Sequence, residues 1–119
     1  MTNYSDWQRS EPYAQAMYIQ GMYDELQASR MLGEDSWVTA RRDGIANCFQ
    51  TQRLTAGMLT DAITKHYQNN VDDWTIAPTM VFAEVTRRIC LSYVNEERAK
   101  IGLAPWKAST GSITAGWSK

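Results

Sequence analysis

The sequence predicts an all-α fold, a small helical bundle of three main helices with short helical turns and an extended C-terminal arm. Apolar residues recur at spacings of three and four in three separate segments, which is typical of helices that bury one face. The 119 residues fit a single domain, and hydrophobic residues make up 44% of them, which suffices for a modest core. We therefore expect a helical domain over residues 1–103 and an arm over residues 104–119.

The first predicted helix starts at Pro12, a residue that fits the first turn of a helix. Its apolar stripe consists of Ala14, Met17, Tyr18, Gly21, Met22 and Leu26. A glycine inside a helix costs about 1 kcal/mol relative to alanine, so we expect another helix or backbone to approach closely at Gly21. The helix is expected to end near Leu32–Gly33.

The segment between residues 33 and 55 contains only short apolar patches, around Trp37 and around Cys48. Because neither patch is long enough to define a helix, we expect a loop that holds one short helical turn.

The second helix is predicted over residues 55–67, with Thr55 as its N-cap, and a polar turn follows over residues 68–74. The third helix is predicted from residue 77 or 78 to about residue 97 or 100, with Pro78 in its first turn. The larger side chains expected in the core are Tyr18, Met22, Met58 and Phe82.

Beyond Gly102 the sequence is rich in Ser, Gly and Thr and loses its periodicity, which predicts the extended arm. Trp106 and Trp117 lie on this arm, whereas free tails usually contain few aromatic residues. We expect these tryptophans to anchor the arm either to its own domain or to a partner, and we slightly favour its own domain.

Charge and hydropathy argue against two classes of partner. Basic residues number 12 and acidic residues 13, and Arg41–Arg42 and Arg87–Arg88 are isolated pairs. Nucleic-acid binding relies on a positive excess, so we expect none. No apolar stretch approaches the roughly 20 residues that a membrane span needs.

The first twelve residues lack the features of an export signal, which leaves a cytoplasmic protein or one whose signal has been removed.

Cys48, Cys90 and His66 are the only residues of their types. Alone they cannot complete a four-ligand zinc site, and we expect no metal or cofactor. The cysteines form a disulfide in an oxidising compartment or remain buried thiols in the cytosol. We interpret His66 as a partly buried residue in the last turn of the second helix; a hydrolase using Cys48 and His66 is the weaker alternative.

Asp72 and Asp73 are adjacent, so their carboxylates point apart, which favours a solvated turn over a catalytic pair. Phosphate-binding and zinc-protease motifs are missing from the sequence, and we expect no catalysis. Trp37 and Trp74 fall in predicted loops, where a rigid aromatic side chain often anchors a protein interface; folding back onto the helices is the equally weighted alternative. The candidate partner-binding residues are Trp37, Asp72, Asp73, Trp74, Trp106 and Trp117.

Three stretches together resemble one family. They are Tyr18–Asp24, the run from Asn47–Phe49 through Thr55–Leu59 to His66–Tyr67, and Ile76–Pro78 continuing to Cys90. In order and spacing, over about residues 13–93, the chain resembles the Rap1a/Tai family of type VI secretion immunity proteins. It departs from the family in lacking an export signal, in carrying Gln15 and Ala16 where a further cysteine is expected, and in adding the arm.

The resemblance implies a small helical bundle, often a homodimer, that resides in the periplasm and covers the active-site cleft of a peptidoglycan amidase. It implies that Cys48 and Cys90 are disulfide-bonded, and that the inhibitory loops lie within Leu32–Asn47 and Gln68–Thr75. The alternative function is a structural or assembly subunit, for example a phage virion accessory protein, whose arm contacts neighbouring copies.

Overall fold

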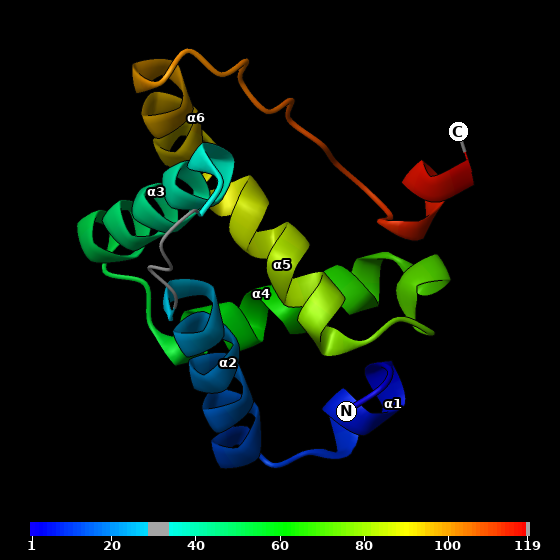
Figure 1. Ribbon diagram of the computed structural model, residues 1–119. Coiled ribbons are helices and arrows are strands. Elements are labelled where there is room, and N and C mark those ends of the chain that lie inside the picture. The colour runs from blue at the N-terminus through cyan, green and yellow to red at the C-terminus, as the bar shows by residue number, and fades with distance from the viewer. Residues whose placement is uncertain (29–33, 119) are drawn as a thin grey trace.

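Helices make up most of the computed structural model, which describes residues 1–28 and 34–118 (Figure 1). These residues contain six α-helices, two 3-10 helices and no strand, which confirms the predicted all-α fold. The elements are α1 Tyr4–Arg9, α2 Pro12–Gln27, α3 Ser36–Gln52, α4 Ala56–Asn69, η1 Val71–Asp73, α5 Pro78–Ile89, α6 Leu91–Lys100 and η2 Thr114–Ser118. None of the described helices is long and apolar enough to cross a membrane.

Three of these helices begin where the sequence predicts. Pro12 and Pro78 occupy the first turns of α2 and α5, and the Thr55 hydroxyl caps α4 by accepting a 3.2 Å hydrogen bond from a first-turn N–H. Within the described residues α2 ends at Gln27, and the predicted end near Leu32–Gly33 lies outside them.

The loop predicted between residues 33 and 55 is wrong, because α3 forms a helix over most of this segment. Its buried residues include the small side chains Ala40, Gly44 and Cys48, and the helix packs mainly on α6. A face of small residues lets two helices approach closely but leaves no stripe of large apolar side chains in the sequence. Trp37 consequently lies in the first turn of a helix and not in a loop.

The third predicted helix is interrupted at Cys90. Helix α5 ends at Ile89 and α6 begins at Leu91, with Cys90 at φ −99° and ψ 11° between them. Cys90 forms a disulfide with Cys48 of α3, in which the two sulfur atoms lie 2.07 Å apart. The disulfide thus ties α3 to the junction of α5 and α6, and a second, smaller core surrounds it.

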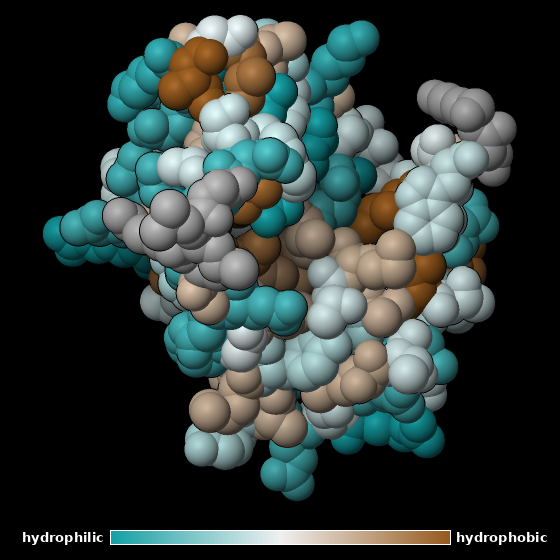
Figure 2. Space-filling model, viewed as in Figure 1, coloured by the Kyte–Doolittle hydropathy of each residue, from teal (hydrophilic) through white to brown (hydrophobic). Residues whose placement is uncertain are grey.

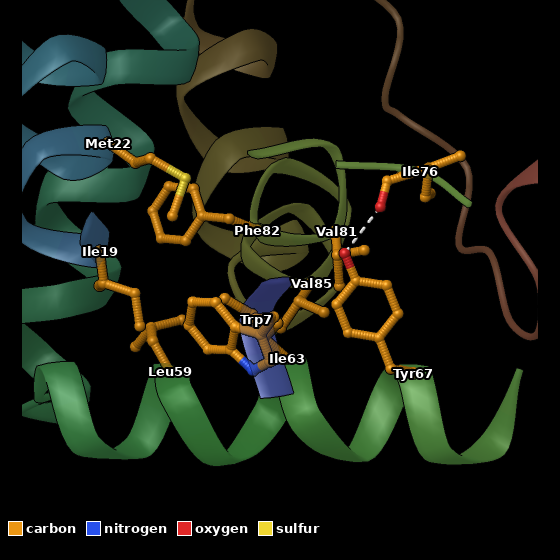
Figure 3. Close-up of a cluster of buried hydrophobic side chains, with 10 residues drawn as sticks. All are labelled: Trp7, Ile19, Met22, Leu59, Ile63, Tyr67, Ile76, Val81, Phe82 and Val85. Atoms are coloured by element: carbon orange, nitrogen blue, oxygen red, sulfur yellow. Dashed lines mark hydrogen bonds between the residues drawn. The ribbon is translucent and has the colours of Figure 1, made fainter. Parts of the chain in front are cut away.

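The main core lies between α2, α4 and α5 (Figure 3). Its buried side chains are Trp7, Ile19, Met22, Leu59, Ile63, Tyr67, Ile76, Val81, Phe82 and Val85. The Tyr67 hydroxyl donates to the Ile76 carbonyl at 2.8 Å, and burial raises the pKa of this phenol well above its usual value. Met22 and Phe82 are buried as predicted, whereas Met58 is 48% exposed.

Helix α1 belongs to the same core, which sequence analysis does not predict. The Trp7 side chain is fully buried, and its indole N–H donates to the Thr64 hydroxyl of α4 at 3.0 Å. A single large aromatic residue within a polar segment produces no helical periodicity, so the sequence pattern gives no sign of this contact.

The close approach expected at Gly21 is not observed. A Cβ atom placed at Gly21 meets no described atom within 4 Å outside its own helical turn. The glycine that lets two helices touch is Gly44, in the helix that the sequence pattern fails to predict.

Candidate functional site

Asp73 is a buried centre that holds the C-terminal arm. Its carboxylate accepts hydrogen bonds from the Ser112 hydroxyl at 2.7 Å, from the Ile113 N–H at 2.8 Å, and from the Thr114 N–H and hydroxyl at 3.0 and 2.8 Å. His66 Nε2 of α4 lies 2.6 Å from Asp73 Oδ2, the oxygen that also accepts the Ile113 N–H. The prediction of a solvated turn is therefore wrong for Asp73, which is fully buried, and holds for the exposed Asp72.

The hydrogen bonds around Asp73 keep its carboxylate charged. Burial raises the pKa of this group, but the N–H groups of Ile113 and Thr114, together with His66 and Ser112, outweigh burial and hold the pKa far below its ordinary value. A carboxylate that receives this many donors binds them strongly, because each is a charge-assisted hydrogen bond. The ionised Asp73 therefore serves as an anchor for the arm.

Along the rest of its length the arm is held by side chains of α5 and α6 that bind its backbone. Arg98 donates to the Ala104 carbonyl at 2.7 Å, and Arg87 donates to the Lys107 carbonyl at 2.9 Å. Arg88 donates to the Gly111 carbonyl at 2.8 Å. Figure 1 shows the resulting path from the end of α6 to η2, beside the end of α4.

Trp106 lies against two of these arginines. The guanidinium carbons of Arg87 and Arg98 lie 5.1 and 5.5 Å from the ring centroid, within the range of cation–π contacts. The backbone N–H and carbonyl of Trp106 both bind the Asn95 side chain, at 2.7 and 3.0 Å. Trp106 thus anchors the arm to its own domain, the alternative that sequence analysis places slightly ahead.

The histidine, aspartate and serine that meet here do not form a catalytic triad. In a triad the histidine accepts the serine proton, but Ser112 donates to Asp73 and not to His66. Cys48 is bonded to Cys90 and has no thiol to act as a nucleophile, which contradicts the Cys48–His66 hydrolase. No group of three or more metal-ligating side chains occurs within residues 1–28 and 34–118.

An apolar groove runs along α5, between α2 and α3 on one side and the arm on the other. We call it the α5 groove. It is lined by Leu26, Arg41, Ile45, Met80, Ala83, Glu84, Thr86, Arg87, Trp106, Ile113 and Trp117 and encloses about 360 Å³. A second hollow of about 260 Å³, which shares Leu26, Arg41 and Ala83, continues it toward α2. Figure 2 shows brown and tan atoms recessed at the centre of this face.

The structure brings two of the predicted partner-binding residues together at this groove, and a third lies against one of its lining residues. Trp106 and Trp117 line it, and Trp117 is 59% exposed. Trp37 lies beneath the Arg41 guanidinium, whose carbon is 5.2 Å from the ring centroid, and is 44% exposed. Two of these tryptophans therefore line the groove, and Trp37 contacts the groove residue Arg41.

Trp74 and Asp72 do not belong to this group. Trp74 packs beside Tyr4 of α1, and its indole N–H donates to the Tyr67 carbonyl at 2.7 Å. It is nevertheless 45% exposed, and Asp72 beside it is exposed as well. Sequence reasoning missed Arg41, Thr86 and Met80 as groove residues, because their roles depend on how the arm crosses α5.

Two segments implied as inhibitory loops also differ from expectation. Residues 36–47 of the first segment are helical, and its residues 32 and 33 lie outside the described part of the chain. The second segment contains the end of α4 and the 3-10 helix η1.

Compared with known proteins, the chain matches no family model, no curated protein and no solved structure.

Proposed function

We propose that this protein binds another protein without catalysing a reaction, and that it is an immunity-type protein whose partner is a peptidoglycan amidase. The observation that carries the proposal is the α5 groove, an open apolar surface lined by Trp106 and Trp117, with Trp37 packed against its Arg41. Exposed apolar surface that is gathered in one concavity marks interaction sites on monomeric proteins.

The scaffold around the groove supports a binding role. The Cys48–Cys90 disulfide links α3 to the junction of α5 and α6, and the Asp73 anchor fixes the arm that forms one wall. A binding surface that is ordered before the partner arrives loses less conformational entropy on association. Both walls of the groove are thus held without a partner.

The choice of an amidase rests on the resemblance and on the disulfide. Cys48 and Cys90 are the pair that the resemblance implies, and they are bonded in the structure. A structural disulfide is compatible with an oxidising compartment such as the periplasm, where peptidoglycan amidases act. The proposed mechanism is steric: the helical body covers the amidase cleft once the groove has bound the cleft's rim.

Co-elution with a peptidoglycan amidase from the same organism tests the proposal. On size-exclusion chromatography the two proteins are expected to elute as one complex. Trp117→Ala is expected to weaken the complex, since it removes the most exposed aromatic side chain of the groove. Tyr13→Ala, which removes a 76% exposed ring outside the groove, is the matched control. Separate elution of the wild-type proteins would count against an amidase partner.

A second candidate function is an assembly subunit, which the exposed ring of Trp117 near the chain end favours. On this alternative, Trp117 fills a pocket on a neighbouring copy and the purified protein forms oligomers larger than a dimer. Light scattering on the wild type and on Trp117→Ala separates the candidates. Large oligomers that the substitution dissolves would support assembly, whereas a monomer or homodimer that it leaves unchanged favours the immunity role.

A further inference from the structure

Two polar groups in the α5 groove lack the hydrogen-bond partner that buried polar atoms normally have. Within the described part of the chain, neither Arg41 Nε nor Thr86 Oγ1 has a partner, although both atoms are buried. Thr86 itself is 1% exposed. Native proteins satisfy nearly all such groups, because an unmet buried donor or acceptor is costly. Thr86 Oγ1 is closed to an occupant, whereas Arg41 is partly exposed and lines the groove, so its guanidinium is the polar group that an occupant can contact.

Trp37 holds the Arg41 side chain in position at the groove. Its guanidinium lies over the Trp37 ring, 5.2 Å from the centroid, and the residue lines both hollows of the groove. Among the described residues it forms no ion pair within 4.0 Å. The groove therefore presents a fixed cation in an apolar wall.

The acidic residues at the groove do not neutralise this cation. Glu84 is already engaged by Arg88 at 3.2 Å and by the Ser109 hydroxyl at 2.5 Å. Glu25 lines the α2 end of the groove, and no ion pair joins it to Arg41 in the described chain. A negative charge on the occupant can therefore pair with the Arg41 guanidinium.

The geometry points to an apolar protein segment bearing a carboxylate as the occupant of the α5 groove, with the carboxylate on the Arg41 guanidinium. This inference rests on the proposed function in one respect, that the occupant belongs to a partner protein. Helix α5, which forms the floor, has 12 residues and is about 18 Å long. An amphipathic helix of similar length, with apolar side chains three and four residues apart, matches this floor.

Binding of synthetic helical peptides to the full chain tests the inference. The probe is an acetylated and amidated amphipathic peptide of about 12 residues, the length of α5, with a leucine stripe flanked by one glutamate. A second peptide carries glutamine in place of that glutamate. Chemical shifts of the backbone amides of Ala83 and Thr86 and of the Trp117 indole N–H report on occupancy of the groove.

We expect shifts confined to the groove and an affinity about tenfold higher for the glutamate peptide, the effect of one charge-assisted hydrogen bond. Arg41→Gln is expected to abolish this difference between the peptides. Arg53→Gln, the same change at an exposed arginine just after α3, is expected to preserve it.

Three results would overturn the inference: no shift at the groove with either peptide, equal affinities for the two peptides, or an Arg41→Gln protein that still prefers glutamate. Sodium decanoate is tested in parallel, and tighter binding of this fatty acid at the groove would assign the site to a lipid. Because the experiment contains no amidase, peptide binding without amidase inhibition would count against the amidase partner and leave the groove intact.

Discussion

Gly44 of α3 lies directly against Val94 of α6, so that a Cβ atom at position 44 would be 2.6 Å from the Val94 Cα and 2.8 Å from its backbone nitrogen. Real Cβ atoms do not approach backbone atoms this closely. One turn further along α3, Cys48 is bonded to Cys90, just before α6 begins. The absence of a side chain at Gly44 therefore sets the distance at which α3 and α6 pack.

Gly44→Ala is expected to destabilise the protein by about 1–3 kcal/mol, because α6 must move to accept the added methyl group. Urea denaturation measures the change in the free energy of unfolding. Gly21→Ala is the matched control, since position 21 is open and lies inside α2. It is expected to stabilise by about 0.5–1 kcal/mol through helix propensity alone. Equal effects of the two substitutions would contradict the close contact between α3 and α6.

Loss of the Cys48–Cys90 disulfide is expected to lower stability substantially. The cysteines are 42 positions apart, and closing a loop of that size is worth about 4 kcal/mol on the chain-entropy model. Thermal melting with and without reductant measures the effect, with the Cys48→Ala, Cys90→Ala double variant as a protein that reductant does not change. A wild-type melting temperature that is indifferent to reductant would show that the bond does not contribute.

Asp73→Asn is expected to release the arm. The substitution removes the charge that the Ile113 and Thr114 amides bind, and hydrogen bonds to charged groups are worth about 1.5–3 kcal/mol each. Hydrogen exchange of these two amides should accelerate at least about tenfold. Asp72→Asn alters the neighbouring exposed carboxylate and should leave both amides protected, since only the Asp72 carbonyl contacts Thr114. Unchanged protection in Asp73→Asn would contradict the anchor.

The same anchor makes a defined contribution to pH dependence. The pKa of Asp73 is lower in the folded protein than the value of about 3.9 in an unfolded chain. Its stabilising effect is therefore fully present above about pH 5 and decreases as the pH falls through and below 3.9. The difference in unfolding free energy between wild type and Asp73→Asn is expected to narrow over that range. A difference that stays constant down to acid pH would mean that another group is responsible.

The sequence predicts helices whose buried face consists of large apolar residues. Helices α2, α4 and α5 have such faces and recognisable first turns, and each was predicted with nearly its observed start. Helix α3 was missed because glycine, alanine and cysteine carry much of its packing. Helix α1 was missed because one tryptophan carries its packing.

The candidate site is harder to predict, because it depends on contacts between distant parts of the chain. The arm is fixed by side chains that bind backbone atoms, as Arg88 binds the Gly111 carbonyl, and such bonds leave no periodic pattern. In the sequence, Arg41 is one residue of an isolated basic pair, and only the fold shows that it lines the groove. Trp106 and Trp117, by contrast, are conspicuous in the sequence, and both line the groove.

Inhibition of a peptidoglycan amidase from the same organism is the most direct test of a binding role without catalysis. Increasing amounts of this protein are added to a fixed amount of enzyme, and the release of cleaved peptidoglycan fragments is followed. The account predicts that turnover falls in proportion to the added protein and stops when the two are equimolar. Undiminished turnover in the presence of a large molar excess would contradict it.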